Sequence, residues 1–171
     1  MNMNESSVPM VGILMGSVSD KDVMKGAVAV LKEMAIPFEV KVISAHRTPE
    51  LAREYAVSAA DRGINVIIAG AGWAAHLAGV LASHTTLPVI GVPIDSSPLQ
   101  GMDALLATVQ MPPGIPVATV SIGVGGARNA AVLAAEIIAL KDKSVADKIK
   151  KFRQTVTSKA LASVDELADL S

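Results

Sequence analysis

The chain has 171 residues, which fits one domain with enough length to bury a sizeable core. Its net charge of −1 and its low aromatic content, 2%, argue against a nucleic-acid groove or a base-stacking platform. The absence of cysteine excludes disulfides, thiolate nucleophiles and Cys-ligated metals. Residues 1–9 lack the positive cluster and the apolar run of a signal peptide, so we expect a cytoplasmic protein.

Strands and helices alternate along the chain. Apolar and β-branched runs predict strands over residues 10–15, 37–43, 65–69, 88–92 and 117–121. Helices are predicted after the turns at 16–20 and 70–72, ending near 35 and 83, and over 49–62, 102–110 and the apolar stretch that ends at 140.

This alternation predicts an α/β fold: a three-layer, doubly wound (flavodoxin-like) parallel sheet with helices on both faces. We expect one domain over residues 1–171, with its core at about 10–140 and a helical tail over 141–171.

Residues 63–94 contain no Asp, Glu, Lys or Arg, and on a simple count this stretch is long enough to span a bilayer. Polar residues, glycines and a proline divide it into strand, turn, helix and strand. We therefore expect a buried part of the α/β core and no membrane partner.

Charge is distributed unevenly along the chain. Of the 15 basic and 16 acidic residues, 12 lie in residues 141–171. Residues 129–140 are apolar almost all round, which for a helix indicates burial on more than one side. We therefore expect a homo-oligomer. In the tail, Val145, Ile149, Phe152 and Val156 form one helical stripe, which packs either on its own subunit or on a neighbour.

The stretch on which the functional argument depends begins with residues 40–43, which read as a buried strand. His46 and Arg47 follow, and then Thr48 and Pro49 open a helix as a plausible N-cap and first-turn residue. A His and an Arg thus stand at the carboxyl end of a parallel strand, where open α/β sheets bind ligands. The alternative is an exposed basic loop that only solvates the turn.

A second turn, residues 16–20 (Gly-Ser-Val-Ser-Asp), follows the first predicted strand. It offers backbone N–H groups and two hydroxyls to an anion, and Asp20 could accept hydrogen bonds from ribose hydroxyls. The alternative is that Ser19 or Asp20 only caps the next helix. The turn lacks the lysine of a Walker-type loop, which argues against a triphosphate site.

The third turn, residues 70–75, has the form G-x-G-x-x-A, with Asp95 further along the chain. A dinucleotide site is one interpretation, and a close-packed pocket for something small and apolar is the other. His76 and His84 follow without partners at metal-ligand spacing, so a metal site is not expected and structural roles are the simpler interpretation.

Together these stretches resemble one family. The matching segments occur in order: 16–20, 44–49 (Ser-Ala-His-Arg-Thr-Pro), 70–72 with 74–77 (Ala-Ala-His-Leu), 87–93, 109–112 (Val-Gln-Met-Pro) and 114–119. They are similar to the N5-carboxyaminoimidazole ribonucleotide mutases of purine biosynthesis over about residues 11–140. Trp73 and Ala78 depart from the pattern, because the family commonly has a glycine and a proline at these positions.

The resemblance implies an isomerase that moves a carboxylate from the exocyclic nitrogen of aminoimidazole ribonucleotide to carbon 4 of the ring. The carbamate loses carbon dioxide readily, and carbon 4 of the remaining enamine is already nucleophilic, so no cofactor or metal is required. One proton must reach the departing nitrogen and another must leave carbon 4. His46 is the candidate general acid and base for both steps.

The resemblance also implies the binding roles. Ser19, Ser44 and Arg47 would hold the phosphate, and Asp20 the ribose. The carboxylate or carbon dioxide would lie against Ser17, Ala71, Gly72 and Leu77, with Gly16 in the same site and His76 supporting the wall. The family is octameric, so a homo-octamer acting on a small ribonucleotide is expected.

Two other functions compete with this interpretation. An aminoimidazole ribonucleotide carboxylase would use free carbon dioxide, but its chain looks different after the fourth strand, whereas this one keeps the mutase-like loop at 109–112. A carboxylating enzyme for a different nucleotide-like substrate is a further variant on the same scaffold. A non-catalytic nucleotide-binding oligomer would keep the pocket, yet simple binding does not require His46 beside Arg47.

Overall fold

The computed structural model describes residue 8 and residues 10–165, and it contains the predicted alternation. The strands are β1 (Val11–Met15), β2 (Phe38–Val42), β3 (Val66–Gly72), β4 (Val89–Ile94) and β5 (Ala118–Thr119). The helices are the 3-10 turn η1 (Val18–Asp20), α1 (Lys21–Glu33), α2 (Pro49–Ser58), α3 (Leu77–Ala82), α4 (Met102–Val109), α5 (Gly123–Ala139) and α6 (Lys143–Asp165).

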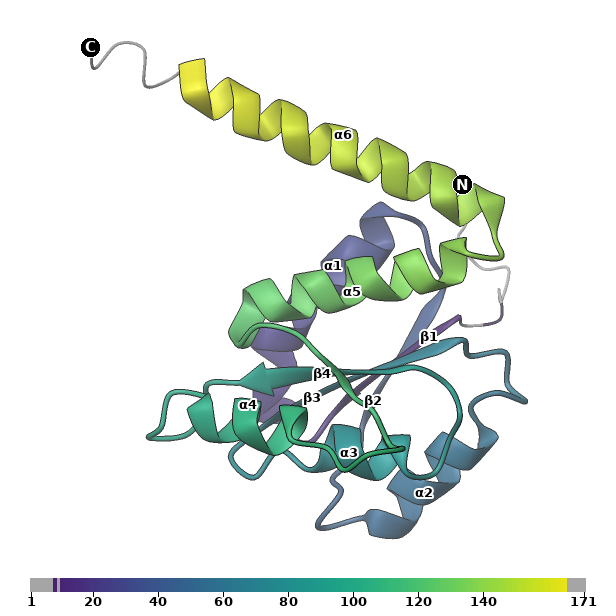
Figure 1. Cartoon of the computed structure of the whole chain (residues 1–171), viewed down its shortest axis with the longest axis vertical. Helices are drawn as coiled ribbons and strands as arrows, with labels where there is room; N and C mark the ends of the chain where they lie inside the picture. The colour runs from purple at the N-terminus through teal and green to yellow at the C-terminus, as the bar shows by residue number, and fades with distance from the viewer. Residues whose placement is uncertain (1–7, 9, 166–171) are drawn as a thin grey trace.

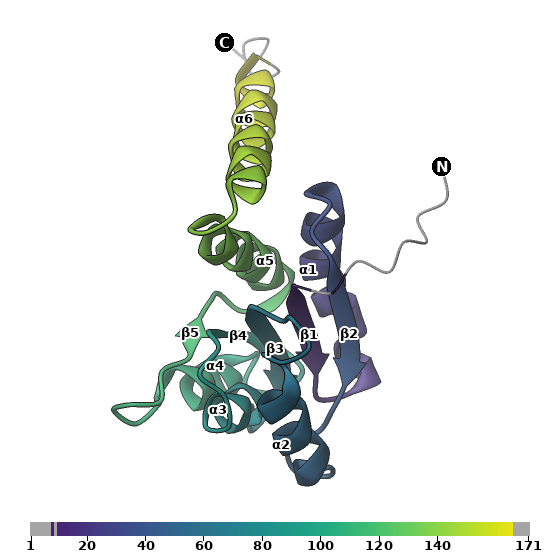
Figure 2. The same ribbon diagram turned by 90° about the vertical axis from the view of Figure 1, so that its right-hand side faces the viewer.

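The five strands form one parallel sheet in the order β2-β1-β3-β4-β5. Helices α1 and α5 cover one face, and α2, α3 and α4 cover the other (Figures 1 and 2). The two cores follow from strand alternation: Ile13 of β1 packs with α1 and α5, while its neighbour Leu14 packs with α2 and α3. The three-layer, doubly wound fold is confirmed. The chain runs from β1 outward to β2 and then returns past β1 to β3, so the strand order reverses between β1 and β3. Open α/β sheets bind ligands at such a switch point.

The second strand is less buried than predicted. Val40 and Val42 are both exposed, Val42 at 50%, and only Ile43 beyond the strand is buried. Its place explains the error: among the described strands β2 pairs with β1 alone, so it forms an edge of the sheet. A β-branched run predicts a strand but does not tell an edge from the centre.

The third strand is longer than predicted, and the helix after it is shorter. Gly70 and Gly72 were expected in a turn, but both pair with neighbouring strands. The turn falls at residues 73–76 and α3 begins only at Leu77. Residues 63–94, which lack charged side chains, are therefore β3, α3 and β4 in the interior, as expected. Among the described residues, no helix combines the length and the apolar character needed to cross a bilayer.

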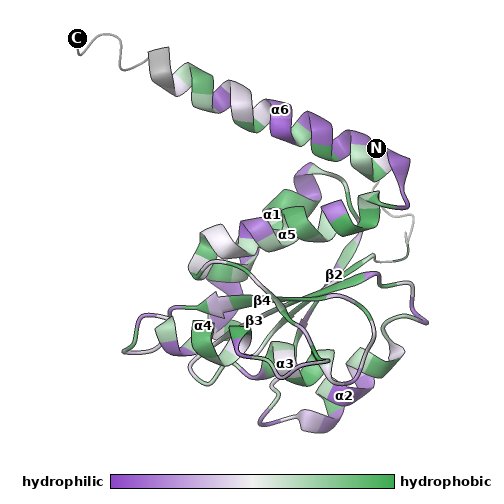
Figure 3. Cartoon of the chain, viewed as in Figure 1, coloured by the Kyte–Doolittle hydropathy of each residue, from purple (hydrophilic) through white to green (hydrophobic). Residues whose placement is uncertain are grey.

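Helix α6 begins against the body of the protein and then extends beyond it (Figure 1). Val145 and Ile149 are buried in the cluster that contains α5, Phe152 is partly buried there, and Val156 is 52% exposed. Lys148 Nζ donates to the carbonyl oxygen of Ala35 at 2.9 Å. The first half of the apolar stripe therefore packs on its own chain, and Figure 3 shows hydrophilic and hydrophobic residues mixed along α6.

Candidate active site

One cavity of about 600 Å³ opens at the carboxyl ends of β1, β2, β3 and β4, at the switch point of the sheet. Every residue that the sequence analysis assigned to the site lines it. These residues are Gly16, Ser17, Ser19, Asp20, Ser44, His46, Arg47, Ala71, Gly72, His76 and Leu77. Turns that are up to 60 residues apart in the chain thus share one cavity, because parallel strands end at one edge.

The turn after β1 is fixed by a reciprocal cap. The backbone N–H of Ser17 donates to Asp20 Oδ2 at 3.0 Å, and the Ser17 hydroxyl accepts from the Ser19 backbone N–H at 3.3 Å. Asp20 stands at the N-cap position of α1, as one of the two expected alternatives had it, but its side chain makes no cap hydrogen bond to that helix. Instead, the side chains of Ser17 and Asp20 together cap η1. Asp20 is only 5% exposed. Burial raises the pKa of its carboxyl, although backbone N–H groups and the charge of Arg47 act in the opposite direction.

Arg47 is held across the cavity by neutral oxygens. Its Nε donates to Ser44 Oγ and its Nη2 to the carbonyl oxygen of Gly16, both at 3.3 Å. Among the residues that the structure describes, no carboxylate forms an ion pair with it, so its charge faces no anionic partner there. Thr48 stands at the N-cap position as predicted, but its hydroxyl makes no cap hydrogen bond. It donates to the Ser44 carbonyl at 2.9 Å and so closes the loop that carries Arg47.

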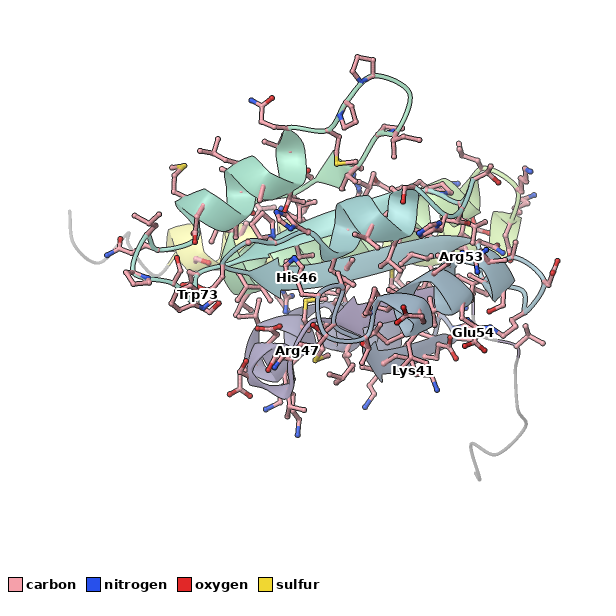
Figure 4. The ribbon with its side chains drawn as sticks, turned by 90° about the horizontal axis from the view of Figure 1, so that it is seen from below. Lys41, His46, Arg47, Arg53, Glu54 and Trp73 are labelled. Atoms are coloured by element: carbon pink, nitrogen blue, oxygen red, sulfur yellow. The ribbon has the colours of Figure 1, made fainter. Side chains whose placement is uncertain are left out.

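The two histidines of the cavity contact each other, which the sequence did not predict. His46 Nε2 lies 2.8 Å from His76 Nδ1, with the rings edge to face at a centroid distance of 4.9 Å. This hydrogen bond requires a proton on one nitrogen and a lone pair on the other. Figure 4 shows His46 and Arg47 together on the loop after β2. The arrangement provides a proton donor and a proton acceptor at one place in the cavity that Arg47 also lines.

Apart from Trp73, the wall formed by residues 70–75 carries only glycine and alanine, and at Gly70 and Gly72 the neighbours leave no room for a larger residue. A Cβ on Gly70 would lie 2.3 Å from Met24 Sδ, and one on Gly72 would lie 1.9 Å from Ser96 Oγ. The dinucleotide interpretation is wrong for these glycines, because they lie in a strand rather than in a strand-to-helix turn. The close-packed, small-residue pocket is the arrangement observed.

The cavity has further lining residues that were not assigned a role: Ala45, Trp73, Ala74 and Ser96. Ser96 has a signal that was overlooked, because the polar loop at 95–101 follows the carboxyl end of β4 and so meets the same edge. His84 and Asp95 do not line the cavity. Within residues 10–165, no group of three His, Asp or Glu side chains is arranged to hold a metal ion.

Comparison with known proteins gives a consistent result. The family model described as AIR carboxylase matches residues 10–159. An N5-carboxyaminoimidazole ribonucleotide mutase of Bacillus subtilis is 55% identical over 159 residues, which is 93% of this chain and 98% of the relative. The mutase of Pyrococcus abyssi is 59% identical over 89% of this chain and 86% of its own.

A solved structure agrees with this assignment. The crystal structure of PurE from Treponema denticola has a TM-score of 0.79 and 32% identity, and it covers 93% of this chain and 98% of its own. Sequence, fold and cavity thus point to one assignment. The chain belongs to the AIR carboxylase family, among the N5-carboxyaminoimidazole ribonucleotide mutases of purine biosynthesis.

Proposed function

We propose that this chain converts N5-carboxyaminoimidazole ribonucleotide into 4-carboxy-5-aminoimidazole ribonucleotide, with His46 as the general acid and base. The contact between His46 and His76 is the observation that carries the proposal. The hydrogen bond to His76 supports a fixed orientation of the His46 ring, and this ring lines a cavity of ribonucleotide size.

The reaction needs two proton transfers and a place for carbon dioxide. His46 gives a proton to the exocyclic nitrogen as the carbamate breaks, and carbon dioxide leaves with its carbon–nitrogen bond electrons remaining on nitrogen. Carbon 4 then attacks carbon dioxide, and His46 removes the proton from carbon 4, which restores the protonated histidine. His76 receives or donates the hydrogen bond that orients His46 between the steps.

Carbon dioxide must stay beside the ring and away from water between these steps. The small wall of Ala71 and Gly72, with buried Leu77 behind it, supports such a site because it admits a small apolar molecule next to the ring. No cofactor is invoked, because the aminoimidazole itself supplies the nucleophilic carbon.

The polar side of the cavity supports binding of the ribose phosphate. Within the described part of the chain Arg47 has no carboxylate partner. The Ser44 hydroxyl contacts it and Ser19 lines the same cavity, so we assign the phosphate to these three. Asp20 and Ser17 lie on the neighbouring turn, where the Asp20 carboxyl oxygens would accept hydrogen bonds from ribose hydroxyls. These roles agree with those implied by the family resemblance.

We also propose that the enzyme is a cytoplasmic homo-octamer. An exposed apolar face on and before α4, formed by Leu99, Met102, Leu106 and Val109, supports contacts between subunits. Light scattering coupled to gel filtration measures the mass directly. A monomer at micromolar concentration would contradict the assembly but leave the chemistry untouched.

The decisive assay supplies two substrates separately. One reaction contains fresh N5-carboxyaminoimidazole ribonucleotide, the other aminoimidazole ribonucleotide with bicarbonate, and both are followed by ultraviolet absorbance of the ring-carboxylated product. Fast conversion in the first at low bicarbonate supports the mutase. Product only in the second, rising with dissolved carbon dioxide, indicates the carboxylase that the family description also names.

His46→Asn tests the residue assignment. The variant should fold and assemble normally but lose turnover by at least about a hundredfold, the range of general acid–base catalysis. His84→Asn is the matched control, because His84 is exposed and lies outside the cavity. Activity near wild type in His46→Asn would remove His46 from the mechanism. Ligand binding without turnover in the unmodified chain would favour the non-catalytic binding protein.

A further inference from the structure

Trp73 is the only tryptophan of the chain, and it stands at the edge of the cavity. Its side chain is 59% exposed although it is the largest apolar group among the lining residues. Figure 4 shows it at the same end of the sheet as His46 and Arg47. A large exposed aromatic surface at the mouth of a cavity is a place where a flat ligand group gains contact.

The backbone of Trp73 is in the left-handed region, with φ at +54°. A bulky side chain is disfavoured there, whereas glycine adopts this conformation without cost. Strained residues of this kind occur where the surrounding structure and the function hold them. Glycine would satisfy the backbone at this position, so the tryptophan side chain must supply something that glycine lacks.

The surroundings of Trp73 indicate what that is. The neighbouring wall carries only Ala71, Gly72 and Ala74, and the opposite turn carries hydroxyls and a carboxylate. These groups suit the carbon dioxide, the ribose and the phosphate, but none of them offers an extended flat surface to the imidazole ring. The indole ring does, and it lies on the same loop as the small wall where the ring must sit.

We propose that Trp73 binds the imidazole ring of the substrate by aromatic contact and covers the mouth of the cavity in the complex. This role rests on the proposed function, since it requires a ribonucleotide with an aromatic base. Trp73 is then a substrate-binding residue at a position where the resembling family commonly has glycine.

Intrinsic fluorescence tests the proposal directly, because all tryptophan emission comes from Trp73. Aminoimidazole ribonucleotide should shift or quench the emission with a saturable dependence on concentration. Ribose 5-phosphate, which occupies the polar side but has no base, should change it little. Calorimetry on the same samples establishes whether each ligand is bound.

The two failures are distinguishable. Unchanged emission while calorimetry shows aminoimidazole ribonucleotide bound would overturn the role of Trp73 and leave the proposed function standing. An equal change with ribose 5-phosphate would also overturn it, because the base would then be irrelevant. If calorimetry shows no binding of aminoimidazole ribonucleotide, the proposed function is overturned and the role of Trp73 with it.

Three substitutions separate the ring from the backbone. Trp73→Gly and Trp73→Ala should both raise KM about tenfold, the loss expected for one base stacked on an aromatic side chain. Trp73→Phe should recover most of this loss. Trp73→Gly should melt at a higher temperature than Trp73→Ala, because only glycine relieves the left-handed backbone. Wild-type KM in both Trp73→Gly and Trp73→Ala would refute the contact.

Discussion

Two neighbouring glycines at the start of α5 should respond to alanine in opposite directions. A Cβ on Gly126 would lie 1.6 Å from the carbonyl oxygen of Ser121 and 2.6 Å from its carbonyl carbon, whereas no atom of the described residues lies within 4 Å of a Cβ on Gly125. The obstacle at Gly126 is backbone, so no rotation of a side chain can relieve it. Both glycines are in the helix, and alanine is the better helix former.

The expected magnitudes follow from this geometry. Gly125→Ala should raise the free energy of unfolding by about 0.5–1 kcal/mol, the difference in helix propensity. Gly126→Ala should lower it by about 3 kcal/mol, the upper end of overpacking, because α5 must move from its place beside Ser121. At about 2–4 °C per kcal/mol for a chain of this size, Tm rises by a few degrees in the first variant and falls by roughly 6–12 °C in the second.

Urea and thermal melts of both variants at equal protein concentration provide the measurement, because any assembly makes Tm depend on concentration. Failure of Gly126→Ala to fold, with a normal Gly125→Ala, agrees with the reasoning. Equal effects of the two substitutions would refute it, since only the contact with Ser121 distinguishes them.

Two further predictions concern pH. Burial raises the pKa of the Asp20 carboxyl in the folded protein. The shift therefore stabilises the folded state below the usual pKa of 3.8, and this stabilisation is lost as pH rises through the raised pKa of the folded protein. Asp20→Asn should therefore be at least as stable as wild type at pH 7 but raise KM by about tenfold or more; lower stability at pH 7 would contradict this. For Glu39, burial alone would raise the pKa, but the hydrogen bond from Arg62 at 2.6 Å and the charge of Arg62 lower it overall. Its contribution to the free energy of unfolding is therefore present above pH 4.5 and is lost as pH falls through the lowered pKa of the folded protein. Glu39→Gln should lower Tm at pH 7, with the gap to wild type closing in acid, and a gap that stays constant in melts from pH 7 to pH 3 would show that the ion pair is not its source.

The fold was predictable because local pattern and global topology agree. Apolar runs that alternate with amphipathic stretches predict a parallel α/β sheet. The structure contains the strands and helices in the predicted order. The pattern could not identify β2 as an edge, because the exposure of Val42 depends on which strands are absent beside it. It also placed Gly70 in a turn, since glycine is common both in turns and where a packed side chain such as Met24 needs space.

The sequence predicted which residues line the site, but it did not predict the contacts between them. The rule that parallel strands end at one edge brings His46, Asp20 and His76 together. It does not give the hydrogen bond between the two imidazoles, which depends on the exact path of residues 73–76 after β3. The reciprocal cap of η1 by Ser17 and Asp20 likewise depends on a 3-10 turn that no periodicity reveals.

The location of the cavity has a consequence for the newly synthesised chain. All residues that line it lie between Gly16 and Ser96, so a ribosome has made the whole site before α5 exists. Yet the apolar face of β3 and β4 is covered by the alanine-rich side of α5, which ends at Ala139. Until that helix leaves the exit tunnel, Ile90 and its neighbours remain without cover, a form prone to aggregation. Activity must therefore appear late in synthesis, when the last covering helix has docked.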